Sequence, residues 1–259
     1  MFDSHLHIID PRFPIVANNG YLPPVFTVAD YQLLAAGLTL PITGGVVVSG
    51  SFQGLDTSYL RDCLDLLGEG FVGVANVAED VTDDALLALA HARVRGIRFN
   101  LVRGVGSGVA AADAASSVLA LGRRAWDVAG LHSELYVDAA DLPALETTLA
   151  QLPHTSIDHL GISADGAGRD SLLRLVERGT RVKATGFGRI DLDVVATLRS
   201  IHAVNPLALM FGTDLPSTRA RRPFEAADVD VVAEALGEEA SAAVFESNAR
   251  VFYRMPQAE

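Results

Sequence analysis

The 259-residue chain is acidic, with a formal net charge of -12, 49% apolar residues and a single cysteine, Cys63. This charge argues against general nucleic-acid binding, which needs a basic surface, and one cysteine excludes an intramolecular disulfide. No apolar run reaches the roughly 18 residues of a membrane-spanning helix, and the amino terminus lacks the basic region of a secretory signal. We therefore expect a cytoplasmic protein that binds neither nucleic acid nor membrane.

The first strand is expected over residues 2–8 and carries the pair His5 and His7. Because side chains alternate between the two faces of a strand, these imidazoles project side by side. Two converging imidazoles suit a divalent-metal site or an acid–base and electrophilic site. The irregular stretch from Asp10 to Asp30 follows, and a loop of about twenty residues is commonly a functional one.

Strand-like and helix-like segments alternate along the rest of the chain. Further strands are expected at residues 45–49, 71–77, 94–100, 131–138, 156–160, 181–186 and 208–212. Helical patterns cover residues 27–38, 59–67 and 83–92, an Ala-rich helix ends near Gly130 after a glycine-rich connection at 104–108, and a closing helix spans 238–254.

Eight strands, each followed by a helix, indicate an α/β fold: a single (β/α)8 barrel of about 250 residues that takes up the whole chain, residues 1–259. A doubly wound open sheet is the main alternative. It is weakened because no Gly-x-Gly-x-x-Gly turn follows the first strand.

In such a barrel the loops at the carboxyl ends of the strands converge, so these ends are expected to form the active site. Besides the histidine pair, the strand ends offer Arg98, Asn100, Tyr136, His159, Lys183, Thr185, Arg189 and Asp214, with His132 and Glu134 deeper. Structural roles stay open for several of them. Asp214 could cap a turn, and His159 could fill the core. Arg98 could pair with a structural carboxylate such as Glu134.

Together these residues resemble the amidohydrolase superfamily, and within it the amidohydrolase-2 branch that includes the 2-pyrone-4,6-dicarboxylate lactonases. The resemblance rests on the order of six motifs: Asp3-Ser4-His5-Leu6-His7, Gly96-Ile97-Arg98-Phe99-Asn100, Ile157-Asp158-His159-Leu160-Gly161, Val182-Lys183-Ala184-Thr185-Gly186, Gly212-Thr213-Asp214-Leu215-Pro216 and Asn248-Ala249-Arg250. It implies a distorted (β/α)8 barrel. It also implies a water that attacks an ester, lactone or amide carbonyl among His5, His7, His159 and Asp214.

Metal-dependent members of the superfamily generally add a histidine or a modified lysine near the end of the fourth or fifth strand. Here the fourth strand ends in Arg98 and Asn100, and the fifth offers Tyr136 and Glu134. This departure resembles the lactonase branch, some of whose members work without metal, so no required cofactor is favoured. A single Zn²⁺ or Mn²⁺ stays open, because three or four N and O ligands suffice. Its ligands would be His5, His7, His159 and Asp214.

The leading prediction is hydrolysis of a small carboxylated lactone. Asp214 would act as general base on a water, while His5, His7 and His159 polarise the carbonyl. The predicted substrate contacts are Arg98, Asn100, Tyr136, Thr185, Arg189, Arg219 and Arg222. Among these, the arginines would bind carboxylates bidentately.

Two other functions stay open. One is a metal-dependent amidohydrolase or decarboxylase of the same superfamily, and the other is a non-catalytic barrel that binds a small acid. In every case the loops at residues 10–30 and 216–224 are expected to set specificity, since loops on a rigid barrel commonly do.

Overall fold

The computed structural model describes residues 1–102, 111–163 and 166–257, apart from the side chains of residues 111–114. The expected glycine-rich connection at 104–108 lies outside the described residues. Eight parallel strands follow one another around the sheet in chain order. They are β1 (Phe2–Leu6), β2 (Gly44–Val48), β3 (Phe71–Ala75), β4 (Val94–Asn100), β5 (His132–Tyr136), β6 (Thr155–Ile157), β7 (Arg181–Ala184) and β8 (Leu209–Phe211).

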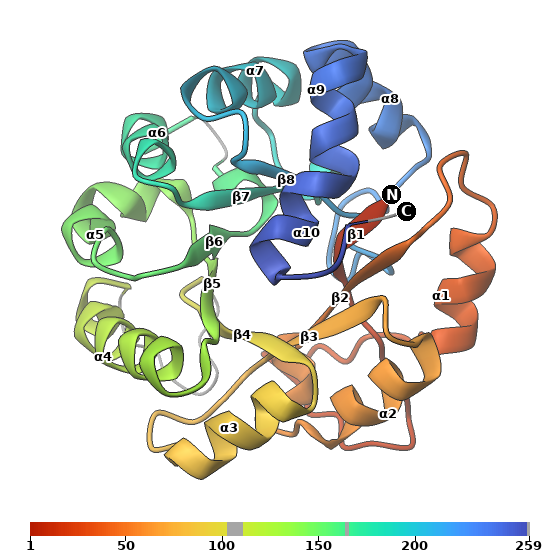
Figure 1. Ribbon diagram of the computed structural model, residues 1–259, viewed down its shortest axis with the longest axis vertical. Coiled ribbons are helices and arrows are strands. Elements are labelled where there is room, and N and C mark those ends of the chain that lie inside the picture. The colour runs from red at the N-terminus through yellow and green to blue at the C-terminus, as the bar shows by residue number, and fades with distance from the viewer. Residues whose placement is uncertain (103–110, 164–165, 258–259) are drawn as a thin grey trace.

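The sheet curls into a nearly closed barrel, with β8 beside β1 (Figure 1). The hydroxyl of Ser4 in β1 donates to the carbonyl of Met210 in β8 at 3.3 Å. Helices surround this ring of strands (Figure 1). The (β/α)8 barrel expected from the alternation of segments is confirmed.

The helices are α1 (Val28–Ala35), α2 (Ser58–Leu67), α3 (Asp83–His91), α4 (Ala111–Ala129), α5 (Leu142–Leu149), α6 (Arg169–Glu177), α7 (Val194–Val204), α8 (Ala227–Leu236), α9 (Glu238–Ala242) and α10 (Asn248–Tyr253). Helix α1 begins where the sequence predicts, because Thr27 and Asp30 form a reciprocal capping box. The expected closing helix is instead α9, a π-helical turn (Ala243–Ser247) and α10 in succession. Within the described ranges, none of the helices combines the length and the apolar character needed to span a membrane.

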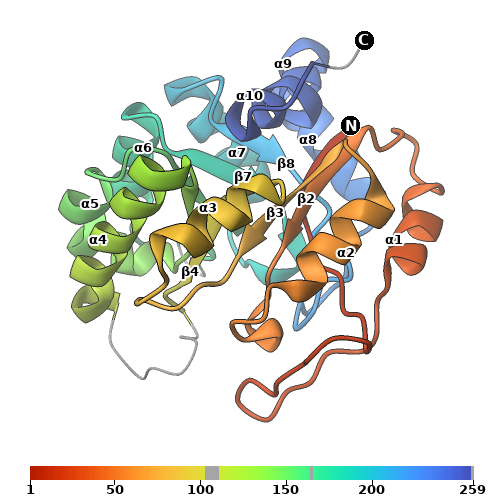
Figure 2. The ribbon, with the colours of Figure 1, turned by 60° about the horizontal axis from the view of Figure 1, so that its bottom comes forward.

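Short 3-10 turns follow several strands at the carboxyl end: η1 (Ser51–Gln53), η2 (Ala139–Asp141), η3 (His159–Gly161) and η4 (Phe187–Arg189). β6 ends earlier than the predicted 156–160 because the chain turns at His159, whose φ is 51°. The segment after β1 extends from the barrel at the end opposite the two termini, as Figure 2 shows. The loop at residues 10–30, which was expected to set specificity, therefore lies at the end of the barrel opposite the termini.

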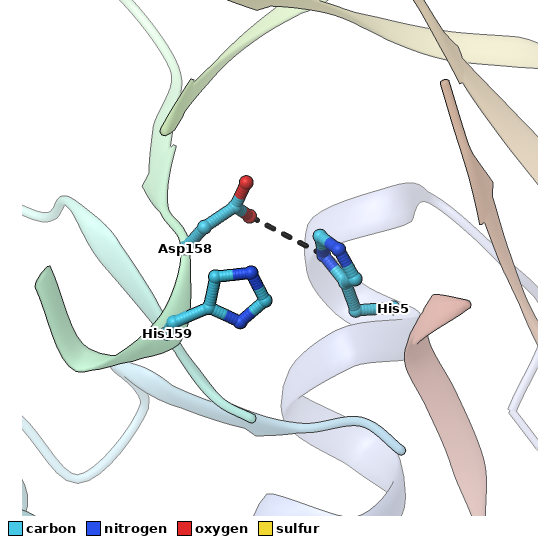
Figure 3. Close-up of side chains that lie close together, drawn as sticks. All are labelled: His5, Asp158 and His159. Atoms are coloured by element: carbon cyan, nitrogen blue, oxygen red, sulfur yellow. Dashed lines mark ion pairs between the residues drawn. The ribbon is translucent and has the colours of Figure 1, made fainter. Parts of the chain in front are cut away.

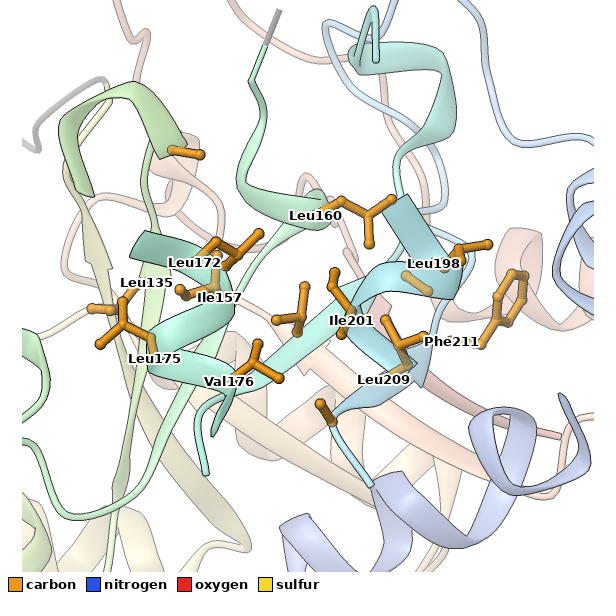
Figure 4. Packing of buried hydrophobic residues seen from close by; sticks show 14 of the residues in the cluster. Leu135, Ile157, Leu160, Leu172, Leu175, Val176, Leu198, Ile201, Leu209 and Phe211 are labelled. Carbon is orange, nitrogen blue, oxygen red and sulfur yellow. The ribbon is translucent and has the colours of Figure 1, made fainter. Parts of the chain in front are cut away.

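Alternation along each strand separates two environments. Leu135, Ile157 and Leu209 face outward and pack against helix residues such as Leu172 and Leu198 (Figure 4). The neighbouring side chains of β5 and β7 point into the barrel and are charged, since Glu134 and Lys183 are fully buried there. Charged groups inside a barrel are costly unless they are paired, so their partners need to be identified.

Candidate active site

The four predicted catalytic residues lie together at the carboxyl end of the barrel. The Nε2 atoms of His5, His7 and His159 are 3.9, 3.7 and 4.0 Å from Oδ1 of Asp214. The ring of His5 packs edge-on against those of His7 and His159, with centroid distances of 4.9 and 4.8 Å. All four side chains are buried. Figure 3 shows the rings of His5 and His159 next to each other, with Asp158 beside both.

Asp3 ties the loop that carries Asp214 to the first strand. Its Oδ1 accepts the backbone N–H of Thr213 at 2.8 Å, and its Oδ2 accepts the Thr213 hydroxyl at 2.7 Å. The backbone N–H of Asp214 donates to the carbonyl of His5 at 2.8 Å. A side chain at Gly212 would come within 2.7 Å of the His5 nitrogen, so only glycine permits this approach. Asp3 was not predicted as a site residue. Its position two residues before His5 is the sequence signal that could have indicated it.

Arg189 and Asp214 form a bidentate ion pair. The guanidinium Nε lies 2.5 Å from Oδ2, and Nη2 lies 3.0 Å from Oδ1. Burial acts to lower the pKa of Arg189, but the Asp214 carboxylate outweighs it and raises that pKa above its usual value. The carboxylate predicted to be a general base is therefore occupied by a cation in this arrangement.

Arg98 pairs with Asp158 and not with Glu134, which was the structural alternative. Its Nε and Nη2 lie 3.1 and 2.8 Å from Oδ2 of Asp158, and Nη1 donates to the carbonyl of Ser49 at 3.0 Å. Burial acts to raise the pKa of Asp158, but His5, Arg98 and Lys183 together hold it well below its usual value. Asp158 was missed as a functional residue, although it directly precedes His159.

A buried charge network lies beneath the imidazoles. The ammonium of Lys183 is 2.6 Å from Oε2 of Glu134, 3.1 Å from Nδ1 of His5 and 3.6 Å from Oδ1 of Asp158. Burial acts to raise the pKa of Glu134, and the neighbouring Lys183 is the main cause of its net lowering. The roles of Lys183 and Glu134, open from the sequence, thus include charge pairing with each other.

Two of the imidazoles are held neutral. Burial is the main cause that lowers the pKa of His7 and His159 well below the usual value, and nearby His5 and arginines add to it. Nδ1 of His7 lies 2.7 Å from the carbonyl oxygen of Val48, which can only accept a hydrogen bond. The proton of His7 is therefore on Nδ1, and its Nε2 presents a lone pair toward Asp214.

Thr185 supports His159. Its hydroxyl oxygen is 2.6 Å from Nδ1 of His159. A side chain at Gly186 would lie 2.6 Å from the same nitrogen, so the turn after β7 fits closely around this ring. Thr185, predicted as a substrate contact, instead contacts the imidazole of His159, one of the predicted catalytic residues.

Most of the other predicted substrate contacts line one cavity with a free volume of about 30 Å³. The predicted residues among its lining are His7, Arg98, Asn100, Tyr136, His159, Arg189 and Arg219. A volume of about 30 Å³ suffices for a water molecule but not for a lactone ring. A larger cavity of about 660 Å³ between α2 and α3 is lined mainly by alanine, leucine and valine side chains, away from the imidazoles.

Arg219 and Arg222 have different surroundings. The guanidinium of Arg219 lies 4.4 Å from the centroid of the Tyr21 ring and donates to the carbonyl of Asn18. It therefore connects the two loops that were expected to set specificity. Arg222 is paired with Asp228 at 2.6 Å and lies outside the described lining of the cavity, so the structure does not bring it to the other predicted contacts.

The site has the N and O donor atoms that a metal ion needs, but the cations around these atoms oppose metal binding. His5, His7 and Asp214 form one potential ligand group, and His5, Asp158 and His159 form another. However, Arg189 engages both oxygens of Asp214, and the Lys183 ammonium contacts the ring of His5. The central charges already balance, with one cation for each carboxylate: Lys183 and Glu134, Arg98 and Asp158, Arg189 and Asp214. A divalent ion in the first group would have to displace Arg189 from Asp214. In the second group it would compete with Lys183 for His5 and with Arg98 for Asp158, so neither group fits a metal in this arrangement.

The amidohydrolase family model Amidohydro_2 matches residues 2–255. The chain belongs to this amidohydrolase family. Members of the family include both metal-dependent and metal-independent enzymes, so membership leaves the cofactor open. The family resemblance stated from the six sequence motifs is confirmed.

Curated relatives of this amidohydrolase are lactone hydrolases by name. The chain is 30% identical over 238 residues to a 2-pyrone-4,6-dicarboxylate hydrolase of Comamonas testosteroni, covering 83% of this chain and 76% of that one. It is 27% identical over 232 residues to a 4-sulfomuconolactone hydrolase of Rhizobium radiobacter, covering 83% and 75%.

Solved structures support the fold of this amidohydrolase. An apo structure from Agrobacterium tumefaciens has a TM-score of 0.84 at 22% identity, covering 99% of this chain and 96% of that one. A protein from Acinetobacter baumannii with citric acid bound has a TM-score of 0.78 at 18% identity, covering 98% and 99%. At these identities the likeness shows the barrel alone.

Proposed function

We propose that this amidohydrolase opens a small lactone that carries at least one carboxylate. The observation that carries the proposal is the convergence of three imidazole Nε2 atoms on Asp214, 3.7 to 4.0 Å from its Oδ1, beside an arginine-lined cavity. Both curated relatives are named for lactones with anionic substituents, which supports the same substrate class here.

In the proposed reaction Asp214 removes a proton from a water molecule as its oxygen bonds to the lactone carbonyl carbon. The carbonyl oxygen becomes an oxyanion, which N–H donors of the imidazole cluster stabilise. The ring C–O bond then breaks, and the departing ring oxygen takes the proton from Asp214. The products are a free hydroxyl or enol and a new carboxylic acid, which releases its remaining proton to solvent and becomes a carboxylate.

The imidazoles do not all have the same role. Because Nε2 of His7 presents a lone pair, it can accept a hydrogen bond from the water but cannot donate one to the oxyanion. This changes the prediction that all three histidines polarise the carbonyl. Donation to the oxyanion is left to His5 and His159, and His7 helps Asp214 to orient the water.

Arg189 links substrate recognition to the base. A substrate carboxylate competes with Asp214 for this guanidinium, since both offer the same bidentate geometry. Transfer of Arg189 to the substrate frees Asp214 and also enlarges a cavity of about 30 Å³. Arg98 and Arg219 also line this cavity and add positive charge to it. Asn100 and Tyr136 line the same cavity.

We further propose that no metal is required, because three cations already pair with the three central carboxylates, Glu134, Asp158 and Asp214. Metal analysis of the purified protein, run beside a hydrolysis screen of neutral, mono- and dicarboxylated lactones, tests the proposal. Turnover of carboxylated lactones by metal-free protein supports it. A stoichiometric divalent ion needed for activity on amides or for decarboxylation would favour the metal-dependent alternative, and tight acid binding without turnover would favour a binding barrel.

A further inference from the structure

Lys183 is a fully buried lysine to which the proposed reaction assigns no part. We propose that Lys183 is a positioning residue that fixes His5 as the Nε2–H tautomer. The two histidines of the His-x-His pair then face the site with opposite hydrogen-bonding polarity. His5 is a donor, whereas His7 is an acceptor.

The direction of the Lys183–His5 hydrogen bond follows from the chemistry of the two groups. The Lys183 Nζ lies 2.6 Å from the Glu134 carboxylate, the contact of a charged ammonium with its counterion, and 3.1 Å from Nδ1 of His5. An ammonium has three protons and no acceptor. Nδ1 must therefore provide the lone pair, and a neutral imidazole that accepts at Nδ1 carries its proton on Nε2.

The opposite arrangement holds at His7, where the partner of Nδ1 is the Val48 carbonyl oxygen at 2.7 Å. A carbonyl can only accept, so Nδ1 carries the proton and Nε2 the lone pair. One ring is set by a buried cation and the other by a backbone oxygen. Their spacing of two residues places both Nε2 atoms within 4 Å of Asp214 Oδ1, at 3.9 and 3.7 Å.

The competing tautomer of His5 has a partner already in place. Oδ1 of Asp158 lies 3.3 Å from the same Nδ1, and among the described residues it has no hydrogen-bond partner (Figure 3). Without the Lys183 ammonium, Nδ1–H of His5 would donate to this oxygen, and the lone pair would move to Nε2. Lys183 thus selects between the two tautomers of His5, because its ammonium and the Asp158 carboxylate both contact Nδ1 of that ring.

This selection also bears on metal affinity. With Lys183 present, only His7 of the pair offers an Nε2 lone pair, and a metal ligand needs one. After removal of Lys183, both histidines would offer lone pairs beside the Asp214 carboxylate. Only the catalytic consequence, donation by His5 to the oxyanion, rests on the proposed function.

The test is ¹⁵N NMR of histidine-labelled protein at a pH where the rings are neutral, since the two tautomers have well-separated ring-nitrogen shifts. The spectrum of His5→Asn identifies the His5 signals. In the wild type we expect Nε2–H for His5 and Nδ1–H for His7. A wild-type His5 in the Nδ1–H form would overturn the proposal even if no variant folds.

The variant Glu134→Leu/Lys183→Met removes the ion pair as a unit, because loss of Lys183 alone would leave a buried carboxylate unpaired. Here His5 should change to Nδ1–H while His7 stays unchanged as an internal control, and Zn²⁺ affinity should rise at least tenfold. Lys183→Arg, which keeps a cationic donor, should retain Nε2–H. An unchanged His5 tautomer in the folded double variant would overturn the role of Lys183. None of these measurements uses a lactone, so their outcome is separable from that of the proposed function.

Discussion

Arg189 holds both oxygens of Asp214, with contacts of 2.5 and 3.0 Å, in the cavity that the imidazoles line. Both carboxylate oxygens accept N–H groups of the guanidinium, so Arg189 has to move before they are open to a water molecule. Under the proposed function this pairing favours anionic substrates, because the substrate carboxylate that takes over Arg189 also frees Asp214.

Replacement of the base gives the first prediction. Asp214→Asn keeps the shape of the side chain but removes the proton acceptor, so kcat on a carboxylated lactone should fall by about 10²–10⁴-fold. Circular dichroism should show an intact fold. If the variant retains most of its turnover, Asp214 is not the base.

Arg189 should discriminate between substrates by charge. In Arg189→Gln, kcat/KM for a carboxylated lactone should fall by about tenfold or more, whereas kcat for a neutral lactone should stay level or rise because Asp214 is released. Arg221→Gln is a matched control on the neighbouring loop, since Arg221 is largely exposed and pairs with Asp191. Equal losses on both substrates would argue against any coupling between recognition and the base.

Variants of Arg98, which lines the cavity, and of Arg222, which is outside its described lining, test which arginine binds a substrate carboxylate. Arg98→Met should raise KM for a dicarboxylated lactone far more than for a neutral one. It should also lower the free energy of unfolding by about 3–5 kcal/mol, because the buried Asp158 loses its partner. Arg222→Met should leave both KM values nearly unchanged, since Arg222 contacts Asp228 instead. An increase in KM for Arg222→Met would restore its predicted substrate role.

The pH dependence of stability should reflect His154, which lies at the opposite end of the barrel against Trp126 and Phe252. Burial lowers the pKa of His154 to about 4, from an ordinary value of 6.5. Below pH 6.5, His154 binds a proton in the unfolded chain but stays neutral in the folded protein. The free energy of unfolding therefore decreases as the pH falls toward 4. Allowing for solvent screening of a half-buried ring, this group contributes about 1 kcal/mol between pH 7.5 and 5. Urea unfolding of wild type and His154→Gln at both pH values measures it, and an equal decrease in the two proteins would contradict it.

Local patterns in the sequence were enough to predict the barrel and the convergence of the central imidazoles. The alternation of strand residues brought His5 and His7 to one face, and the position of Asp214 after the last strand placed it at the same end. These features depend on neighbours within a few residues, where strand geometry is decisive.

Pairings between distant strands could not be predicted in the same way. Lys183 and Glu134 are 49 residues apart, and Arg98 and Asp158 are 60 apart. Long charged side chains inside a barrel have several carboxylates within reach, and the partner depends on the register and tilt of every strand between them. The pairing of Arg98 with Asp158 instead of Glu134 is one such outcome.

The most direct test of the central claim is the initial rate of ring opening by metal-stripped protein on a dicarboxylated lactone, with and without added Zn²⁺. We predict turnover by the stripped protein at the same rate in both conditions, abolished by Asp214→Asn. Activity that appears only when the metal is restored would contradict the account of a metal-free site in which Asp214 acts on water beside two histidines of opposite polarity.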